Sequence, residues 1–132
     1  VSLMFNMEEK KYSILVVEDE SAVSEALGDK LGREGFEVFL AKDGAKGLEV
    51  ALREIPDLIL LDIVMPVMDG ITMLEKMRKD KKGKKIPVIM FTNLSDSDRI
   101  KEAQKKGVND YLIKADWKLE DVVKKVKEKL DI

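Results

Sequence analysis

Asp62 follows an apolar run at residues 58–61, and its carboxylate is the most informative group in the chain. A run of this length is typical of a strand that is buried on both faces of a parallel sheet. Open α/β sheets bind their ligands beyond the carboxyl ends of such strands. Glu18, Thr92 and Lys114 follow three other apolar runs. The sequence therefore predicts acids, a hydroxyl and an amine at one edge of a sheet.

The acids at this edge suit a divalent cation. Carboxylates of Glu18, Asp19 and Asp62 that lie within a few ångströms of one another would repel, and a bound cation relieves that repulsion. The chain has no Cys and no His, so the ligands would be oxygens, which favours Mg²⁺ or Mn²⁺. A carboxylate can also attack a phosphoryl group, and Asp62 is the candidate nucleophile. Lys114 offers a positive charge and Thr92 a hydrogen-bond donor to phosphoryl oxygens.

Length and composition restrict the other possibilities. The chain has 132 residues, of which 45% are hydrophobic, as expected for one globular domain. The missing cysteines and histidines exclude a disulfide framework, a thiolate metal site and a phosphohistidine intermediate in this chain. The net charge of −2 gives no reason to expect nucleic-acid binding. The apolar runs are too short to cross a membrane, so we expect a cytoplasmic protein.

Strand-like and helix-like segments alternate five times along the chain, which predicts an α/β fold with a parallel sheet and helices on both faces. Residues 1–9 are interpreted as an N-terminal extension or an expression remnant, and residues 10–132 as a single domain. The predicted strands are residues 12–17, 36–40, 58–61, 86–91 and 108–113. The predicted helices are residues 21–34, 45–53 and 71–79, one that opens at Ser95 with a capping box, and residues 118–130, with apolar positions at Leu119, Val122, Val123, Val126 and Leu130.

The acidic run 18–20, the segment 62–70, Thr92, Tyr111 and Lys114 together resemble the receiver domain of two-component response regulators. The resemblance extends from about residue 11 to the last residue. It implies a flavodoxin-like (βα)5 doubly wound fold whose five-stranded parallel sheet has the strand order 2-1-3-4-5.

The resemblance also implies a role for each residue of the site. Asp62 would be the phosphoacceptor. Asp19 and Asp62 would bind Mg²⁺ (or Mn²⁺) directly, Glu18 would bind it through water, and the backbone carbonyl of Val64 would complete the protein ligands. Thr92 and Lys114 would bind the phosphoryl group. Tyr111 would act as an aromatic switch that transmits the presence of this group.

The implied function is acceptance of a phosphoryl group from a sensor histidine kinase or a histidine phosphotransfer protein. The domain would not be an enzyme beyond its own phosphorylation and slow autodephosphorylation. The implied output surface is formed by the helix that opens at Ser95, the strand at 108–113 and the helix at 118–130, which would contact a downstream protein or a second copy in a homodimer. We recognise no DNA-binding output domain within these residues, so we expect a stand-alone or phosphorelay receiver, and a fragment of a longer protein stays open as a third possibility.

Four residues depart from the family pattern or control access to Asp62. Ala115 follows Lys114 where the family usually has a proline, and Asn93 follows Thr92 where a small residue is commoner. Val64 and Leu94 place apolar side chains beside the expected approach of water. Because neither can orient a water molecule, we expect slow autodephosphorylation.

Other interpretations of the residues stay open. The domain could be a pseudo-receiver, an interaction module that is not phosphorylated. An aspartate-nucleophile phosphatase is less favoured, because that class uses a second aspartate two positions after the nucleophile, where this chain has Val64. The lysine-rich segment 81–85 is expected at the end of the sheet opposite the acids, as a solvated loop or a basic docking patch.

Overall fold

The computed structural model describes residues 11–93 and 97–132. Strands and helices alternate through these residues, as the hydrophobic pattern predicts. The strands are β1 Ser13–Val17, β2 Glu37–Ala41, β3 Leu58–Leu61, β4 Val88–Thr92 and β5 Asp110–Ile113. The helices are α2 Ser21–Arg33, α3 Gly44–Glu54, α4 Gly70–Lys79, α5 Ser97–Lys105 and α6 Leu119–Leu130, with a short 3-10 helix, η1, at Lys114–Asp116.

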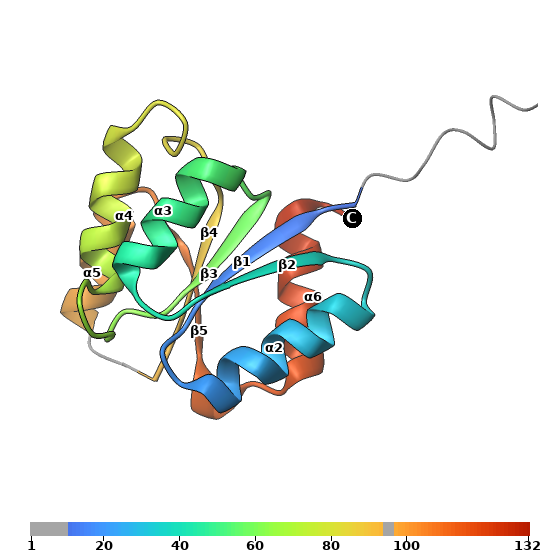
Figure 1. Cartoon of the computed structure of the whole chain (residues 1–132). Helices are drawn as coiled ribbons and strands as arrows, with labels where there is room; N and C mark the ends of the chain where they lie inside the picture. The colour runs from blue at the N-terminus through green and yellow to red at the C-terminus, as the bar shows by residue number, and fades with distance from the viewer. Residues whose placement is uncertain (1–10, 94–96) are drawn as a thin grey trace, which may run out of the picture.

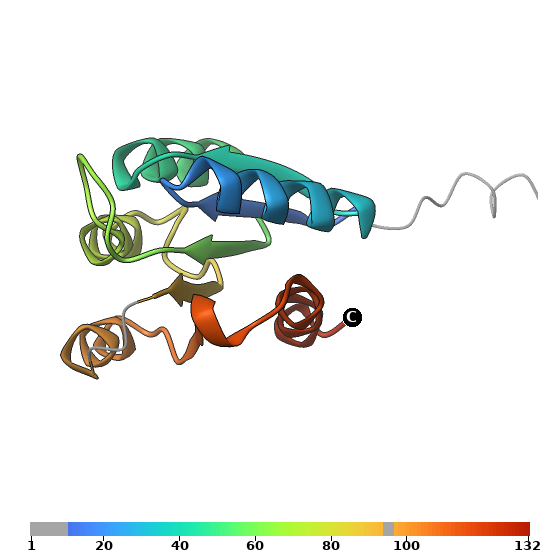
Figure 2. The same cartoon turned by 90° about the horizontal axis from the view of Figure 1, so that it is seen from below.

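The five strands form one parallel sheet in the order β2-β1-β3-β4-β5, so the predicted fold is confirmed. Helices α3, α4 and α5 cover one face of the sheet and α2 and α6 cover the other (Figures 1 and 2). The strand order reverses at β1 and β3, which are neighbours with Val17 opposite Leu61. This reversal leaves a crevice at the carboxyl ends of the two strands, where ligands bind in folds of this kind.

Side chains of the three central strands, β1, β3 and β4, alternate between two apolar cores. Leu15 and Val17 of β1 belong to the core under α3, α4 and α5, whereas Ile14 and Val16 belong to the core under α2 and α6. This alternation explains why the central strands are continuous apolar runs. The two cores hold the sheet rigidly and thereby fix the positions of the polar residues that follow it.

Most element ends differ from the predicted bounds by one or two residues; α3, for example, is Gly44–Glu54 where residues 45–53 are predicted. Leu119, predicted on the apolar face of the last helix, is the first residue of α6 and remains 37% exposed, while Val122 and Val126 are buried as predicted. The capping box predicted at Ser95 lies outside the described residues. Within the described residues, no helix combines the length and the apolar character that a membrane span requires.

Asp110 at the start of β5 pairs with two lysines of α6. Its Oδ2 accepts a hydrogen bond of 2.6 Å from Lys129, and its Oδ1 lies 3.3 Å from the ammonium of Lys125. The hydrogen bonds from Lys129 and Lys125 hold the pKa of Asp110 below its ordinary value of 3.8, and the bond from Lys129 has the larger effect. The folded state therefore binds fewer protons than the unfolded state, and the resulting stability is present above that ordinary pKa and is lost as the pH falls through the folded pKa.

We expect Asp110→Asn to lower the free energy of unfolding by about 0.5–1 kcal/mol at neutral pH, a range that allows for solvent screening. The difference from the wild type should shrink once the pH falls below the folded pKa. Urea unfolding at neutral and acidic pH measures both values. A difference that stays constant with pH would contradict the assignment.

Candidate functional site

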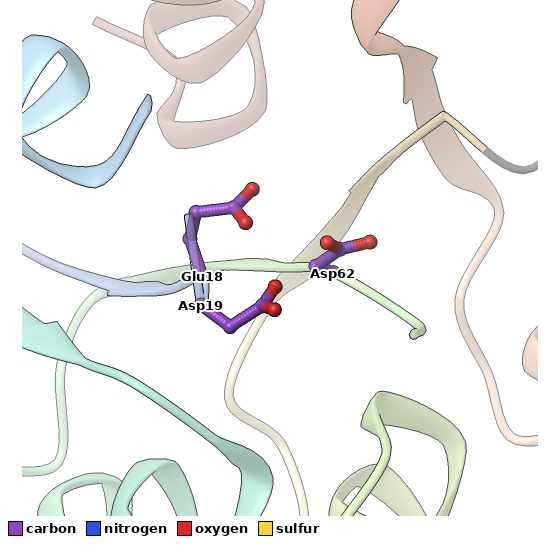
Figure 3. Close-up of side chains that lie close together, drawn as sticks. All are labelled: Glu18, Asp19 and Asp62. Carbon is purple, nitrogen blue, oxygen red and sulfur yellow. The ribbon is translucent and has the colours of Figure 1, made fainter. Parts of the chain in front are cut away.

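Three carboxylates meet at the carboxyl edge of the sheet. Glu18 and Asp19 follow β1, and Asp62 follows β3, the neighbouring strand. One ligand oxygen from each residue can be chosen so that all three lie within 4.8 Å of one another. Figure 3 shows the three carboxylates directed toward a common region. The parallel register of β1 and β3 produces this convergence, because it brings the two strand ends to the same level.

Asp62 is fixed on both sides of its carboxylate. It is only 6% exposed. Its Oδ1 accepts a hydrogen bond of 2.7 Å from the backbone N–H of Ile63, and its Oδ2 accepts one of 2.9 Å from the ammonium of Lys114. Its own backbone N–H donates to the carbonyl of Val17 at 3.1 Å, which continues the sheet by one residue. The carboxylate is therefore held at the crevice with a cation on one oxygen.

Glu18 is the most deeply buried acid of the cluster, at 2% exposure. Its Oε2 accepts the backbone N–H of Glu20 at 3.0 Å, and its Oε1 is ion-paired with Lys114. Burial raises the pKa of Glu18, and the hydrogen bonds from Lys114 and from the Glu20 backbone offset only part of this effect. The ionised form of Glu18 is therefore under-stabilised, and an added cation would stabilise it.

Lys114 supplies the positive charge of the site from the end of β5. Burial by itself would lower its pKa, but its hydrogen bonds with Glu18 and Asp62 outweigh burial and raise the pKa above the ordinary 10.5. The ammonium is therefore charged at neutral pH. It also lies 5.7 Å from the centre of the Phe91 ring, an attractive cation–π distance. The Lys114–Ala115 peptide bond is trans, like the other described peptide bonds, and the chain there forms η1.

An open pocket of about 330 Å³ leads to these groups. The lining residues are Asp19, Glu20, Asp62, Val64, Thr92, Asn93 and Lys114. Asp19 and Asn93 are exposed at its mouth, and Thr92 is buried at 1% exposure at the end of β4. Val64 is 63% exposed on its rim. The pocket thus combines buried charge with access from solvent.

This pocket is not lined by three of the described residues singled out from the sequence, namely Glu18, Tyr111 and Ala115. Tyr111 of β5 is 44% exposed, and Ala115 is exposed in η1 beside Lys114. Leu94 lies outside the described residues. The proposed role of Tyr111 as a switch thus begins from an outward-facing side chain.

Two residues of the segment 62–70 support the site in a way that the sequence analysis did not identify. Asp69 caps the amino end of α4, since its Oδ1 accepts a hydrogen bond from the backbone N–H of Thr72 at 2.7 Å. Gly70 donates its backbone N–H to the carbonyl of Ile63 at 2.8 Å and packs against the backbone of Asp62. The Asp69-Gly70 pair could have indicated this role, because aspartate is a common N-cap residue of helices and glycine has no side chain to prevent close packing.

The donor set fits a hard divalent cation. All three acidic groups are oxygen ligands, and Glu18 and Asp62 are buried while Asp19 is exposed to the pocket. Mg²⁺ usually binds one or two carboxylates and keeps several waters, which an open pocket allows. The chemistry of the residues therefore agrees with the predicted Mg²⁺ or Mn²⁺.

The fold and the pocket define a flavodoxin-like α/β domain with an acidic site at the switch point of its sheet. The family model of the response regulator receiver domain matches residues 14–127. The chain belongs to this family, whose members act in two-component signal transduction.

Known proteins resemble the chain in sequence and in structure. The DNA-binding dual master transcriptional regulator RpaA of Synechocystis is 37% identical over 76% of this chain and 42% of its own length. The receiver domain protein (CheY-like) of Methanospirillum hungatei has a TM-score of 0.86 at 31% identity, covering 92% of this chain and 95% of that one. The CheX–CheY–BeF3–Mg²⁺ complex of Borrelia burgdorferi contains a chain with a TM-score of 0.80 at 28% identity, covering 89% and 87%. The chain spans less than half the length of the first curated relatives.

Proposed function

We propose that this domain accepts a phosphoryl group onto Asp62 from the phosphohistidine of a sensor kinase or a phosphotransfer protein. The observation that carries the proposal is the buried Asp62 carboxylate, held 2.9 Å from Lys114 inside a cluster with Glu18 and Asp19. In the transfer, the bond between phosphorus and the donor's imidazole nitrogen breaks and a bond to an Asp62 oxygen forms. Receiver domains generally interact with histidine kinases and with downstream targets, which agrees with this role.

A bound Mg²⁺ would supply positive charge to the phosphoryl oxygens. Asp19 and Asp62 would hold the ion directly, Glu18 through water and Val64 through its backbone carbonyl. The similar chain of Borrelia burgdorferi is part of a complex that contains BeF3 and Mg²⁺, which supports Mg²⁺ as the ion. Lys114 would bind a phosphoryl oxygen, because its charged ammonium already lies beside Asp62.

The signal would leave the site through Thr92 and Tyr111. The Thr92 hydroxyl would donate to the new phosphoryl group, and Tyr111 would rotate inward from its exposed position. The helix α5 is well placed to move, because Ala103 is buried while its other apolar residue, Ile100, is only half-buried. The face of α5, β5 and α6 is therefore the proposed contact surface for a downstream protein or a second copy.

The test is the intact mass of the protein after incubation with acetyl phosphate and Mg²⁺. We expect one added phosphoryl group, and none when the metal is removed with EDTA. A second sample contains a purified histidine kinase, because the domain could require a protein donor in place of acetyl phosphate. Absence of the added mass in both samples would favour the pseudo-receiver, which then remains as a pure interaction module.

Lys114 makes opposite contributions to metal binding and to phosphorylation. Its ammonium competes with a cation for Glu18 and Asp62. We expect Lys114→Met to bind Mg²⁺ more tightly, by at least about fivefold, since a unit charge about 4 Å away is worth about 1 kcal/mol even in the dielectric of bulk water. The same variant should be phosphorylated more slowly, because the phosphoryl oxygens lose their cation.

Calorimetric titration with Mg²⁺ and the rate of phosphorylation measure these two effects. The control is Lys101→Met, which removes an exposed lysine of α5. Weaker Mg²⁺ binding by Lys114→Met would contradict the proposed competition.

The aspartyl phosphate should be long-lived. Val64 on the pocket rim is apolar and cannot orient an attacking water. We expect a phosphoryl lifetime of minutes or longer after the donor is removed, and a shorter lifetime in Val64→Asn. Loss of the added mass with time measures both lifetimes, and a wild-type lifetime of seconds would refute the prediction.

A DNA-linked output is a second candidate for the complete signalling protein. The relative RpaA is a DNA-binding regulator, and the match covers 42% of its length. A receiver of this kind would then control a separate DNA-binding segment rather than bind nucleic acid itself. Phosphorylation of the genomic full-length product, followed by a DNA-binding assay, distinguishes this output from a purely protein-binding one.

A further inference from the structure

The charge of the domain is divided between the two ends of its sheet. The acids of the pocket lie at the carboxyl ends of the strands, and a groove of about 590 Å³ at the opposite end has only cations among its charged lining residues. The α4–β4 loop, at the top of Figure 1, forms part of this opposite end. We propose that this groove, called here the basal groove, binds an acidic segment of a partner polypeptide. The proposal goes beyond phosphorylation and does not depend on it.

The basal groove is formed by segments that are far apart in the sequence. They are the end of α4, the loop before β4, the turn after α5, and α6. Its floor is apolar, with Ile86 4% exposed and Val88 3% exposed. Its cationic lining residues are Arg78, Lys84, Lys85, Lys105, Lys106 and Lys129. A recessed apolar floor below a cationic rim matches a chain in which acidic and apolar side chains alternate.

Three of the five groove lysines are not neutralised by the described part of the domain. Within the described part of the chain, no carboxylate lies at ion-pair distance from Lys84, Lys85 or Lys105. By contrast, Lys129 pairs with Asp110 at 2.6 Å and Lys106 lies 3.7 Å from a carboxylate oxygen of Glu75. Lysines in the last turn of a helix are explained by the helix dipole, and Lys105 ends α5. Lys84 and Lys85 belong to no helix, so the dipole does not account for them, and their charges are available to a carboxylate of another chain.

The details of the groove favour an acidic polypeptide over nucleic acid or a membrane. Arg78 donates hydrogen bonds to the backbone carbonyls of Gly83 and Lys106, at 2.9 and 3.4 Å, which hold its guanidinium against the wall of the groove. No aromatic side chain lines the groove, so bases would find no stacking platform. The buried floor cannot reach a flat bilayer, and the net charge of −2 opposes broad binding to polyanions.

The test uses the full chain and a short fluorescein-labelled peptide in which aspartate and glutamate alternate with leucine. We expect saturable binding by fluorescence anisotropy that weakens as salt is added. The variant Lys84→Gln/Lys85→Gln/Lys105→Gln should bind about tenfold more weakly, since each exposed ion pair contributes little by itself. The control variant Lys76→Gln/Lys101→Gln/Lys124→Gln removes the same charge from exposed positions outside the groove lining and should bind like the wild type.

A gain-of-binding variant makes the assay independent of folding defects. Asp110→Asn removes the carboxylate that competes for Lys129 and should strengthen peptide binding. Duplex DNA and phosphatidylserine vesicles are tested beside the peptide. Tighter binding to either of them, an equal loss in the two triple variants, or no binding of the acidic peptide would each overturn the proposal. Equal phosphorylation of the wild type and the groove variant would show that the two ends of the sheet act independently.

Discussion

Asp62→Asn should abolish phosphorylation by acetyl phosphate, so that no added mass is detected where the wild type gains one phosphoryl group. The substitution preserves the size of the side chain but removes the anionic oxygen that would attack phosphorus. It also removes one of the three carboxylates of the cluster, so Mg²⁺ should bind more weakly. The expected loss of rate is at least about a hundredfold, since a covalent nucleophile cannot be replaced by its amide.

Asp69→Asn is the matched control for this prediction. The same chemical change is made seven positions along the same segment. The Asp69 carboxylate accepts from Thr72 at the start of α4, and an asparagine caps a helix about as well as an aspartate. We expect the control to be phosphorylated at nearly the wild-type rate. Comparable loss in both variants, or an added phosphoryl group on Asp62→Asn, would refute the assignment of the acceptor.

Gly70→Ala should destabilise the domain and impair the site together. A Cβ at Gly70 would overlap the backbone carbonyl oxygen of Asp62, which is main chain and cannot turn away. Either α4 or the Asp62 segment must then move. Because the interior is closely packed, we expect the free energy of unfolding to fall by about 3 kcal/mol or more. Unfolding in urea measures this change. The rate of phosphorylation should fall as well, because Asp62 no longer faces Lys114.

Gly32→Ala is the control for the effect of glycine replacement itself. Gly32 lies within α2 and is exposed, and a Cβ there would meet nothing within 4 Å. Alanine should therefore stabilise the domain by about 0.4–1 kcal/mol, because it reduces the freedom of the unfolded chain. A Gly70→Ala variant with wild-type stability would contradict the close approach of α4 to the Asp62 backbone.

The fold was predictable because its signals are local. Apolar runs separated by amphipathic segments define a parallel sheet between two layers of helices, and the observed strand order agrees. The errors lie at the ends of elements. Leu119 has the spacing of a core residue, but as the first residue of α6 it is 37% exposed. Periodicity reports the face of a helix, whereas burial of its first turn depends on where the neighbouring strand ends.

The sequence by itself determined which polar groups follow the strands, because the apolar runs end at Glu18, Asp62, Thr92 and Lys114. Only the tertiary structure decided how these groups meet. The ion pair between Lys114 and Asp62 joins residues 52 positions apart, and its geometry follows from the packing of β3, β4 and β5. The basal groove arises in the same way, from lysines on separate segments. Local pattern fixes which residues end each element, and long-range packing alone fixes the distances between them.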